Sequence, residues 1–243
     1  MTELPPPDPA DQIFSCRDES GFYSMCIEHL LLTRVPADAT LVEFGSGDGT
    51  PVITALEKSD FTGRITGFEL NAAAHANCRQ NIHGAGLSSR YQVHCGSFFD
   101  GTPPRYDALL ANPPYIPFPD NSIRLPYLHG GPNGCELTLR LLQEPCRMFM
   151  LILSSYSHPL AIIDQARQQG LVVADFFVTP ISYGRYSREP KVFAYIMDLK
   201  DRGHAFAAAT GYLLAGALFV GADQGCDDRS AYLEKLLRSV NDL

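Results

Sequence analysis

The sequence contains no tryptophan, no Cys-x-x-Cys pair and no low-complexity segment beyond a proline-rich start. Its seven cysteines are odd in number and scattered, so their spacing excludes both a zinc site built on paired cysteines and a disulfide framework. Residues 1–10 lack the basic and then apolar build of a secretory signal peptide. These absences predict reduced thiols, no bound metal and a cytoplasmic location.

Basic residues are also in the minority. The 19 Lys and Arg residues are outnumbered by 27 Asp and Glu residues, which gives a formal net charge of −8. This balance disfavours a broad nucleic-acid-binding face. Arg185, Arg188 and Lys191 could form a local basic strip, although a solvated hairpin is the simpler interpretation of such a short charged run.

The chain has one long stretch without a formal charge, at residues 205–222. Its 18 residues are at the lower limit of a membrane-spanning helix, but Ala and Gly dominate it and no basic cluster flanks it. We therefore expect a helix that is buried in the protein or in a subunit contact, and no membrane association.

The apolar residues are patterned for alternating strands and helices. With 243 residues, 45% of them apolar, the chain can bury one substantial core. Strands separated by helices predict an α/β fold with a doubly wound, seven-stranded, mainly parallel sheet. The strands are expected at residues 40–44, 64–70, 91–95, 107–111, 148–154, 171–178 and 191–198. Helices are expected at residues 21–33, from residue 50, at residues 71–83 and at residues 158–170. The last two strands have no predicted helix between them and should form an antiparallel hairpin.

This patterning divides the chain into three parts. Residues 1–38 are a lead-in with an N-terminal helix, residues 39–200 form the α/β domain, and residues 201–243 form a helical C-terminal extension. Within the extension, apolar residues recur at the helical spacing i, i+3, i+4, i+7, namely Leu233, Leu236, Leu237 and Val240. This stripe either docks on the core or forms the seam of a homodimer.

A strand, a glycine-rich turn and the start of a helix follow one another in residues 42–51. Glycine lets the backbone turn sharply and approach a ligand without a Cβ in the way, and ligands bind at the carboxyl ends of parallel strands. Thr50 stands where a dinucleotide fingerprint starting at Gly45 needs another glycine. Acidic side chains beside the turn suit a cationic ligand better than a pyrophosphate. The expected cofactor-binding residues of this segment are Glu43, Gly45, Ser46, Gly47, Asp48 and Gly49.

Two further segments lie at predicted strand ends. Glu69 ends the second strand, where a carboxylate can accept hydrogen bonds from both ribose hydroxyls, and Leu70 follows it. Ser97 and Phe98 follow the third strand and could give an adenine ring a polar contact and an apolar cover. The alternative for this second segment is an ordinary loop that contributes phenylalanines to the core.

The fourth strand runs into Asn112-Pro113-Pro114-Tyr115. The two prolines fix φ and make the turn rigid, so the Asn112 carboxamide and the Pro113 carbonyl become fixed acceptors for the N–H groups of an amide or aromatic amine. Tyr115 offers a flat face for stacking. An amide nitrogen is a poor nucleophile because its lone pair is delocalised, and such acceptors can align it for attack without a strong base. We therefore predict Asn112, Pro113 and Tyr115 as the catalytic residues.

These motifs resemble those of class I S-adenosylmethionine-dependent methyltransferases that modify planar nitrogens. The glycine turn, Glu69 and the Asn-Pro-Pro-Tyr motif carry the resemblance, and Asn112 also contacts the cofactor in this family's pattern. The later segments Gly130-Gly131-Pro132-Asn133-Gly134 and Leu139-Arg140-Leu141-Leu142, together with Arg17-Asp18-Glu19-Ser20, are similar to the HemK/PrmC-type glutamine methyltransferases of peptide-chain release factors. The resemblance implies a Rossmann-like methyltransferase fold over residues 39–200, S-adenosyl-L-methionine as cofactor and a protein substrate.

The sequence departs from that family at several places. Asn133 replaces an Asp in the glycine loop, and Ser97 stands where an Asp often contacts the adenine side of the cofactor. The separate N-terminal helical domain of the bacterial enzymes, which helps to grip the release factor, has no counterpart in residues 1–38. These changes affect the expected substrate more than the expected cofactor.

Three alternatives to a glutamine methyltransferase stay open. A nucleic-acid amino-group methyltransferase, acting on adenine N6 or guanine N2, would also use an Asn-Pro-Pro-aromatic motif, but the acidic net charge of the chain disfavours it. A small-molecule N-methyltransferase would use residues 116–134 as a lid. A catalytically silent methyltransferase-fold interaction module is the alternative that is not an enzyme.

Overall fold

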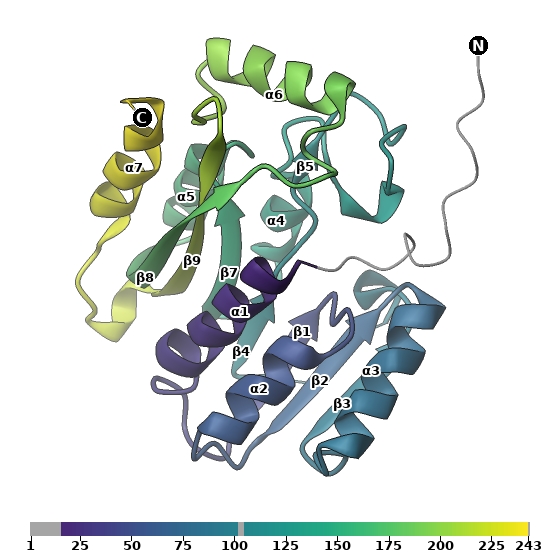
Figure 1. The fold of residues 1–243 in the computed structure, drawn as a ribbon. Helices are drawn as coiled ribbons and strands as arrows, with labels where there is room; N and C mark the ends of the chain where they lie inside the picture. Colours follow the sequence, from purple (N-terminus) through teal and green to yellow (C-terminus); the bar gives the residue numbers. More distant parts are fainter. Residues whose placement is uncertain (1–15, 102–104, 243) are drawn as a thin grey trace.

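The computed structural model describes residues 16–101 and 105–242, which form a seven-stranded sheet with helices on both faces (Figure 1). The strand order is β3-β2-β1-β4-β7-β9-β8, and β9 alone runs antiparallel to its neighbours, β7 and β8. The strands are β1 (Thr40–Phe44), β2 (Arg64–Glu69), β3 (Tyr91–Cys95), β4 (Ala108–Ala111), β7 (Met148–Ser154), β8 (Leu171–Ser182) and β9 (Gly211–Gly221). The predicted fold class, a mainly parallel seven-stranded sheet with an antiparallel C-terminal pair, is confirmed. Residues 1–15 of the predicted lead-in lie outside the described residues, and the rest contains the N-terminal helix.

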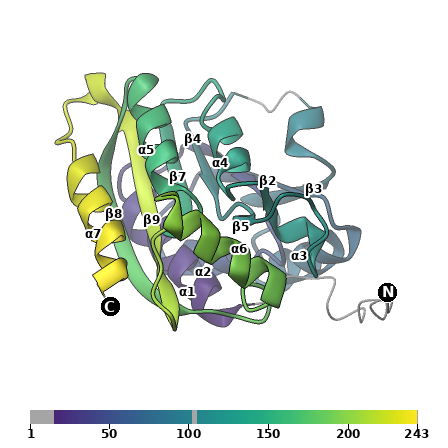
Figure 2. The ribbon, with the colours of Figure 1, turned by 90° about the horizontal axis from the view of Figure 1, so that it is seen from above.

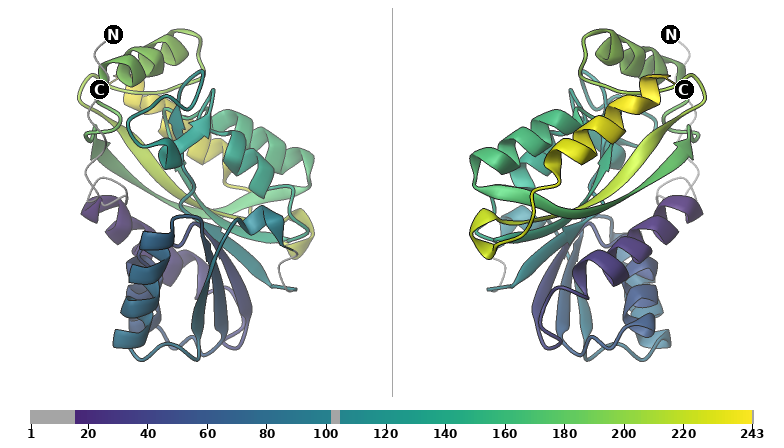
Figure 3. Two further views of the ribbon diagram at one scale, coloured as in Figure 1. Left: turned by 90° about the vertical axis from the view of Figure 1, so that its right-hand side faces the viewer. Right: turned by 90° about the vertical axis from the view of Figure 1, so that its left-hand side faces the viewer.

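The helices form two layers, one on each face of the sheet (Figure 3). One layer contains α1 (Arg17–Cys26) with its π-helical continuation η2 (Ile27–Leu31), α2 (Thr50–Lys58) and α3 (Ala72–Gly84). The other contains α4 (Glu136–Leu141), α5 (Pro159–Gln168) and α7 (Ser230–Ser239). Successive residues of β1 point to opposite faces, so Leu41 packs in the first core cluster and Val42 in the second. Both faces of the sheet are therefore covered by apolar side chains.

The first correction concerns residues 191–198, which were predicted to be the last strand. They lie in α6 (Pro190–Asp201), so the two antiparallel strands β8 and β9 are not joined by a simple turn. The run is rich in β-branched and aromatic residues, which favour a strand. Its buried residues, however, are Val192, Ile196 and Leu199, and their spacing is that of one helix face.

The second correction concerns residues 205–222, which were predicted to be a buried helix. Residues 211–221 of this stretch are strand β9, between β7 and β8 in the sheet. Nearly every residue of β9 is buried because helices cover both faces of the sheet, and this removes the alternation that marks an exposed strand. Gly216 lies where a Cβ would come within 2.2 Å of Cys26 Sγ of α1, so the small residues allow close packing. The sheet therefore reaches beyond residue 200, and residues 201–243 are not a separate helical extension.

The apolar stripe of α7 docks on the core of its own chain. Leu233, Leu237 and Val240 are buried beside α5 and β8, whereas Leu236 is 40% exposed. A homodimer through the C-terminal helices stays a prediction. None of the helices in the described part of the chain is long and apolar enough to cross a membrane.

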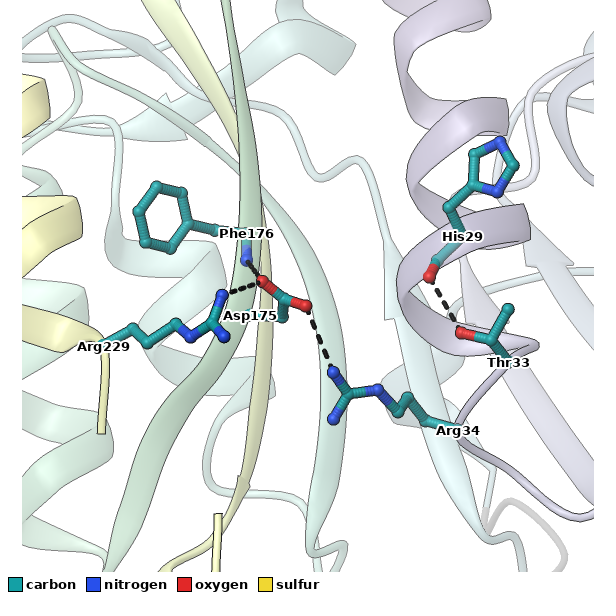
Figure 4. Close-up of polar contacts among 6 residues, drawn as sticks. All are labelled: His29, Thr33, Arg34, Asp175, Phe176 and Arg229. Carbon is teal, nitrogen blue, oxygen red and sulfur yellow. Dashed lines mark hydrogen bonds and ion pairs between the residues drawn. The ribbon is translucent and has the colours of Figure 1, made fainter. Parts of the chain in front are cut away.

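An ion-pair group on the outer side of β8 joins three distant segments (Figure 4). Asp175 accepts hydrogen bonds from Arg34 at 3.1 Å and from Arg229 at 2.8 Å. Arg34 follows the N-terminal helix and Arg229 precedes α7. All three side chains are partly exposed, so each pair contributes about 0–1 kcal/mol.

Candidate active site

A cavity of about 720 Å³ lies at the carboxyl ends of the strands. Residues of the glycine turn and of the segments after β2 and β3 line one end, which we call the cofactor end. The loop after β4, α1 and β9 line the other, which we call the acceptor end. Residues 125–128 and the loop before α6 complete its wall, and Figure 2 shows α6 and β5 (Ile116–Pro117) in front of the sheet on this side. The two predicted motifs therefore meet in one cavity.

The glycine turn has the backbone conformation that only glycine adopts without strain. Gly45, Gly47 and Gly49 have φ values of 71°, 56° and 76°. A Cβ at Gly45 or Gly47 would meet no heavy atom within 4 Å, so the space against these two residues is open to a ligand. Both of them line the cavity.

Glu69 fixes this turn. Its Oε2 accepts a hydrogen bond from the Gly47 N–H, and its Oε1 accepts one from the Asn71 N–H, each at 2.8 Å. The carboxylate lines the cavity beside Leu70, whose side chain is 58% exposed. Glu69 is thus held rigidly by backbone donors and keeps lone pairs for a ligand hydroxyl.

Glu43 is not on the cavity wall, contrary to the prediction that it faces the ligand. Its carboxyl group is buried below the turn, where the hydroxyls of Tyr91 and Tyr23 donate to it at 2.5 and 3.3 Å. Burial raises the pKa of Glu43 to about 7, and the two tyrosine hydroxyls oppose this rise. Glu43 therefore supports the turn from below.

Three other residues of the glycine segment also lie off the wall. Ser46 is buried, and Gly49 packs closely against Cys78 Sγ. Asp48 is exposed, and its Oδ1 accepts a hydrogen bond from the Thr50 N–H at the start of α2. Neither acidic residue of the turn, Glu43 or Asp48, is part of the cavity wall.

The segment after β3 forms an aromatic wall. Ser97 Oγ accepts a hydrogen bond from the Phe99 N–H at 3.1 Å and starts a short 3₁₀ turn. The Phe98 ring lies 5.4 Å from the Phe68 ring and 5.8 Å from the Phe44 ring, in edge-to-face arrangements. The Arg140 guanidinium covers Phe99 at 3.6 Å from its centroid. The sequence predicted Ser97 and Phe98 here but missed the other three aromatic residues and Arg140.

The Asn-Pro-Pro-Tyr motif forms the floor of the acceptor end. Asn112 follows β4, and its Oδ1 is buried without a hydrogen-bond partner among the described residues. Pro113 is buried beside it. The Tyr115 hydroxyl lies 3.1 Å from that of Tyr212, and the Ser157 hydroxyl donates to the Tyr115 carbonyl at 2.7 Å. An acceptor without a donor in a cavity is a site that a ligand N–H can complete.

The glycine-rich segment at residues 130–134 packs directly on this motif. β6 (His129–Gly131) pairs with β5 (Ile116–Pro117), and a Cβ at Gly130 would come within 2.6 Å of the Pro114 carbonyl oxygen. Asn133 donates from its backbone N–H and its side-chain amide to Glu136 at 2.9 and 2.8 Å. An Asp in its place would repel Glu136, which gives a local reason for the amide.

One acidic residue of the acceptor end was not predicted as a site residue. Glu19 of α1 lines the cavity with only 6% of its surface exposed. Its neighbours include Tyr212 of β9, from the stretch that was assigned to a helix. The only sequence signal for Glu19 was the resemblance of the Arg17-Asp18-Glu19-Ser20 segment to the glutamine methyltransferases.

The three basic residues noted in the sequence do not form one hairpin strip. Arg185 lines the mouth of the cavity, with its guanidinium 5.2 Å from the Tyr186 ring centroid. Lys191 lies in α6, 3.5 Å from Glu189 and 5.1 Å from the Phe118 ring centroid. In the part of the chain that the structure describes, no group of three or more His, Cys, Asp or Glu residues could hold a metal ion.

Comparisons with known proteins find methyltransferases. No protein-family model matches the chain. The chain is 35% identical over 79 residues to a release factor glutamine methyltransferase from Cereibacter sphaeroides, which is 32% of this chain and 28% of that one. It is 30% identical over 80 residues to a tRNA1(Val) (adenine(37)-N6)-methyltransferase from Pectobacterium carotovorum, which is 32% of each chain. The matched region thus spans about a third of the curated relatives.

Solved structures show the same fold. A Pyrococcus horikoshii protein considered to be an RNA methyltransferase matches with a TM-score of 0.57 at 14% identity, over 90% of this chain and 92% of that one. The [4+2]-cyclase SpnF matches with a TM-score of 0.51 at 13% identity, over 83% and 81%. This fold carries more than one kind of chemistry, so function has to be argued from the site.

Proposed function

We propose that this protein is an S-adenosylmethionine-dependent methyltransferase that acts on a planar nitrogen, with a protein glutamine amide as the preferred acceptor. The observation that carries the proposal is the unpartnered, buried Oδ1 of Asn112 at the end of β4. It lies in the same cavity as the glycine turn and Glu69. The chain has the class I methyltransferase fold, and parts of its sequence are similar to methyltransferases of glutamine and of adenine.

The residues of the cofactor end fit S-adenosylmethionine. The open space at Gly45 and Gly47 can take the methionine part, Glu69 the ribose hydroxyls, and the aromatic wall around Phe98 the adenine. When bound, this cofactor supplies an electrophilic methyl group on a sulfonium. The chain then has to orient the acceptor nitrogen, and the Asn112 Oδ1 and the Pro113 carbonyl would do so by accepting hydrogen bonds from its N–H groups.

A glutamine amide is the preferred acceptor for two reasons. Its NH₂ group has the two donors that the Asn112 Oδ1 and the Pro113 carbonyl would accept. The second reason is the loop at residues 130–134, which packs closely against the Asn-Pro-Pro-Tyr motif at Gly130. That loop is part of the resemblance to the glutamine methyltransferases.

A nucleic-acid amino group is the second candidate. Arg185 and Tyr186 line the cavity, and Tyr127, which also lines it, is 56% exposed. A guanidinium and exposed aromatic rings can hold a nucleotide by its phosphate and by stacking. This candidate also has three tRNA adenine methyltransferases among the relatives.

Labelled methyl transfer separates the candidates. The purified protein is incubated with S-adenosylmethionine that carries a tritiated methyl group and with protein, RNA or DNA fractions of cells. We expect label in the protein fraction, and methylglutamine after its digestion. Label in RNA or DNA alone would replace the glutamine proposal by the nucleic-acid one, and no label in any of the fractions would contradict both.

A further inference from the structure

The carboxyl group of Glu19 is held at the acceptor end of the cavity with one oxygen unused. Its Oε1 accepts a hydrogen bond from the Tyr212 hydroxyl at 3.3 Å, whereas its Oε2 is buried and has no partner among the residues that the structure describes. Glu69 is the other carboxylate on the cavity wall, and both of its oxygens already accept backbone hydrogen bonds. The free oxygen of Glu19 is therefore an unfilled acceptor in the acceptor end.

The surroundings of Glu19 connect it to the catalytic motif. Tyr212 donates a hydrogen bond to its carboxyl group, and the Tyr115 hydroxyl lies 3.1 Å from the Tyr212 hydroxyl. The Tyr156 ring packs against both tyrosines, with centroid distances of 5.7 and 4.6 Å. Tyr115 is the last residue of the motif that begins with Asn112, so Glu19 and Asn112 face the same end of the cavity.

A buried carboxyl oxygen that has no hydrogen-bond donor lowers the stability of the folded protein. Such a group persists where it has a task that needs it. The proposed reaction has one task that Asn112 does not perform. A planar nitrogen that gains a methyl group must also lose a proton, and the Asn112 carboxamide can accept a hydrogen bond but cannot take up that proton.

We infer that Glu19 accepts the proton that the acceptor nitrogen releases during methyl transfer. The inference rests on the proposed function. An N–H bond of the acceptor breaks and its N–C bond to the methyl forms, the electron pair of the breaking C–S bond stays on sulfur, and the proton passes to Glu19 Oε2. Charge balances, because the positive charge of the sulfonium and the negative charge of the carboxylate both disappear.

The acid–base chemistry of Glu19 suits this role. Burial is the main cause that raises the pKa of Glu19, and the negative charge of Asp18 adds to it. The nearby hydroxyls of Tyr115 and Tyr212 and the Cys16 thiol act in the opposite direction and lower the pKa of Glu19. The hydroxyl of the nearby Tyr156 stays protonated, because burial raises its pKa. The result is a carboxylate that is more basic than one in water.

The test compares Glu19→Gln with the wild type, using as substrate the cell fraction that the wild type labels. Gln keeps the shape of the side chain but cannot take up the proton. We expect a loss of about 10²-fold in the rate of transfer, with affinity for S-adenosylmethionine within a few-fold in calorimetry. The wild-type rate should rise with pH as Glu19 ionises. This rising limb of the pH–rate profile, the pH limb, should be missing in the variant.

A second variant and a control guard against an effect on folding. Tyr212→Phe removes a hydrogen bond that lowers the pKa of Glu19, so the pH limb should move to higher pH. Glu28→Gln changes a carboxyl group of the same helical segment that lies outside the cavity wall, and should leave the rate and the limb as in the wild type.

A further readout needs no cofactor. The carboxyl band of Glu19 is the infrared band that is present in the wild type and absent in Glu19→Gln. This band should titrate at a higher pH than that of an exposed Glu. The inference is overturned if Glu19→Gln keeps the wild-type rate, if it loses cofactor affinity in parallel with the rate, or if the pH limb stays in place in both variants. Failure of the proposed function looks different, since the wild type would then bind no S-adenosylmethionine.

Discussion

The cofactor end and the acceptor end of the cavity differ in how their polar groups are satisfied. At the cofactor end, both oxygens of Glu69 accept backbone hydrogen bonds at 2.8 Å. At the acceptor end, Asn112 Oδ1 and Glu19 Oε2 are buried without partners in the described part of the chain. A satisfied site is preorganised, while an unsatisfied one is completed by its ligand. The difference suggests that the chain builds its cofactor site in advance and leaves its acceptor site for the substrate to complete.

The largest effect is expected from Asn112→Ala at the acceptor end. Loss of the carboxamide should lower methyl transfer by about 10³-fold, because the acceptor nitrogen is no longer aligned. Affinity for S-adenosylmethionine in calorimetry should stay within a few-fold. Asn121→Ala, in an exposed part of the following loop, is the matched control. Near-normal turnover of Asn112→Ala would remove Asn112 from the catalytic role.

The second prediction concerns Glu43, the buried carboxyl group beneath the glycine turn, and its effect on the free energy of unfolding. The pKa of Glu43 is raised to about 7, so its neutral form is the one that the fold favours. The stabilisation from Glu43 is complete below about pH 4.5 and is lost as the pH rises through about 7, by an amount on the order of 3 kcal/mol. In Glu43→Gln, the free energy of unfolding measured with urea should therefore fall less over this range than in the wild type.

The control for Glu43 is Glu57→Gln, which changes an exposed carboxyl group of α2. Its unfolding free energy should follow the wild type at each pH. Equal pH dependence of Glu43→Gln and the wild type would show that Glu43 is ionised in the folded protein throughout this range.

Glu69→Ala tests the preorganised cofactor end itself. The substitution removes the acceptor of the Gly47 and Asn71 N–H groups, so the glycine turn loses its support and the ribose its expected partner. We expect affinity for S-adenosylmethionine to fall about 10- to 100-fold, as for the loss of hydrogen bonds to a charged group. Asp60→Ala, at an exposed position, should bind normally. Unchanged affinity of Glu69→Ala would place the cofactor elsewhere.

The smallest effect is expected outside the cavity, at Asp175. Asp175→Asn weakens the ion pairs with Arg34 and Arg229, which should lower the unfolding free energy by about 1 kcal/mol or less and less still at high salt. Methyl transfer and cofactor affinity should not change. A clear loss of either would mean that this outer group is coupled to the cavity.

The parts of the site that the sequence predicted are those set by short, local patterns. The glycine turn and the Asn-Pro-Pro-Tyr motif each follow a strand directly and Glu69 is the last residue of one, so the parallel fold places them at one edge of the sheet. The parts that it missed depend on distant contacts. Glu19 meets Tyr212 across 193 positions of the chain, and the burial of Glu43 depends on Tyr23 and Tyr91.

The errors in the fold have a related cause. A strand that is buried on both faces loses the alternation of apolar and polar residues, so the Ala- and Gly-rich β9 suggested a helix. The opposite error at α6 came from its β-branched and aromatic residues, which occupy a helix whose buried face is set by tertiary packing. In both cases the neighbours of the segment, and not its own composition, decide its conformation.

Calorimetric titration of the wild-type protein with S-adenosylmethionine is the most direct test of the account. A cofactor end that is formed in advance should bind one molecule per chain with a dissociation constant in the micromolar range, about 8 kcal/mol of binding free energy. The binding should need no acceptor substrate. An absence of detectable binding at millimolar S-adenosylmethionine would contradict the account and leave the protein as a catalytically silent module with this fold.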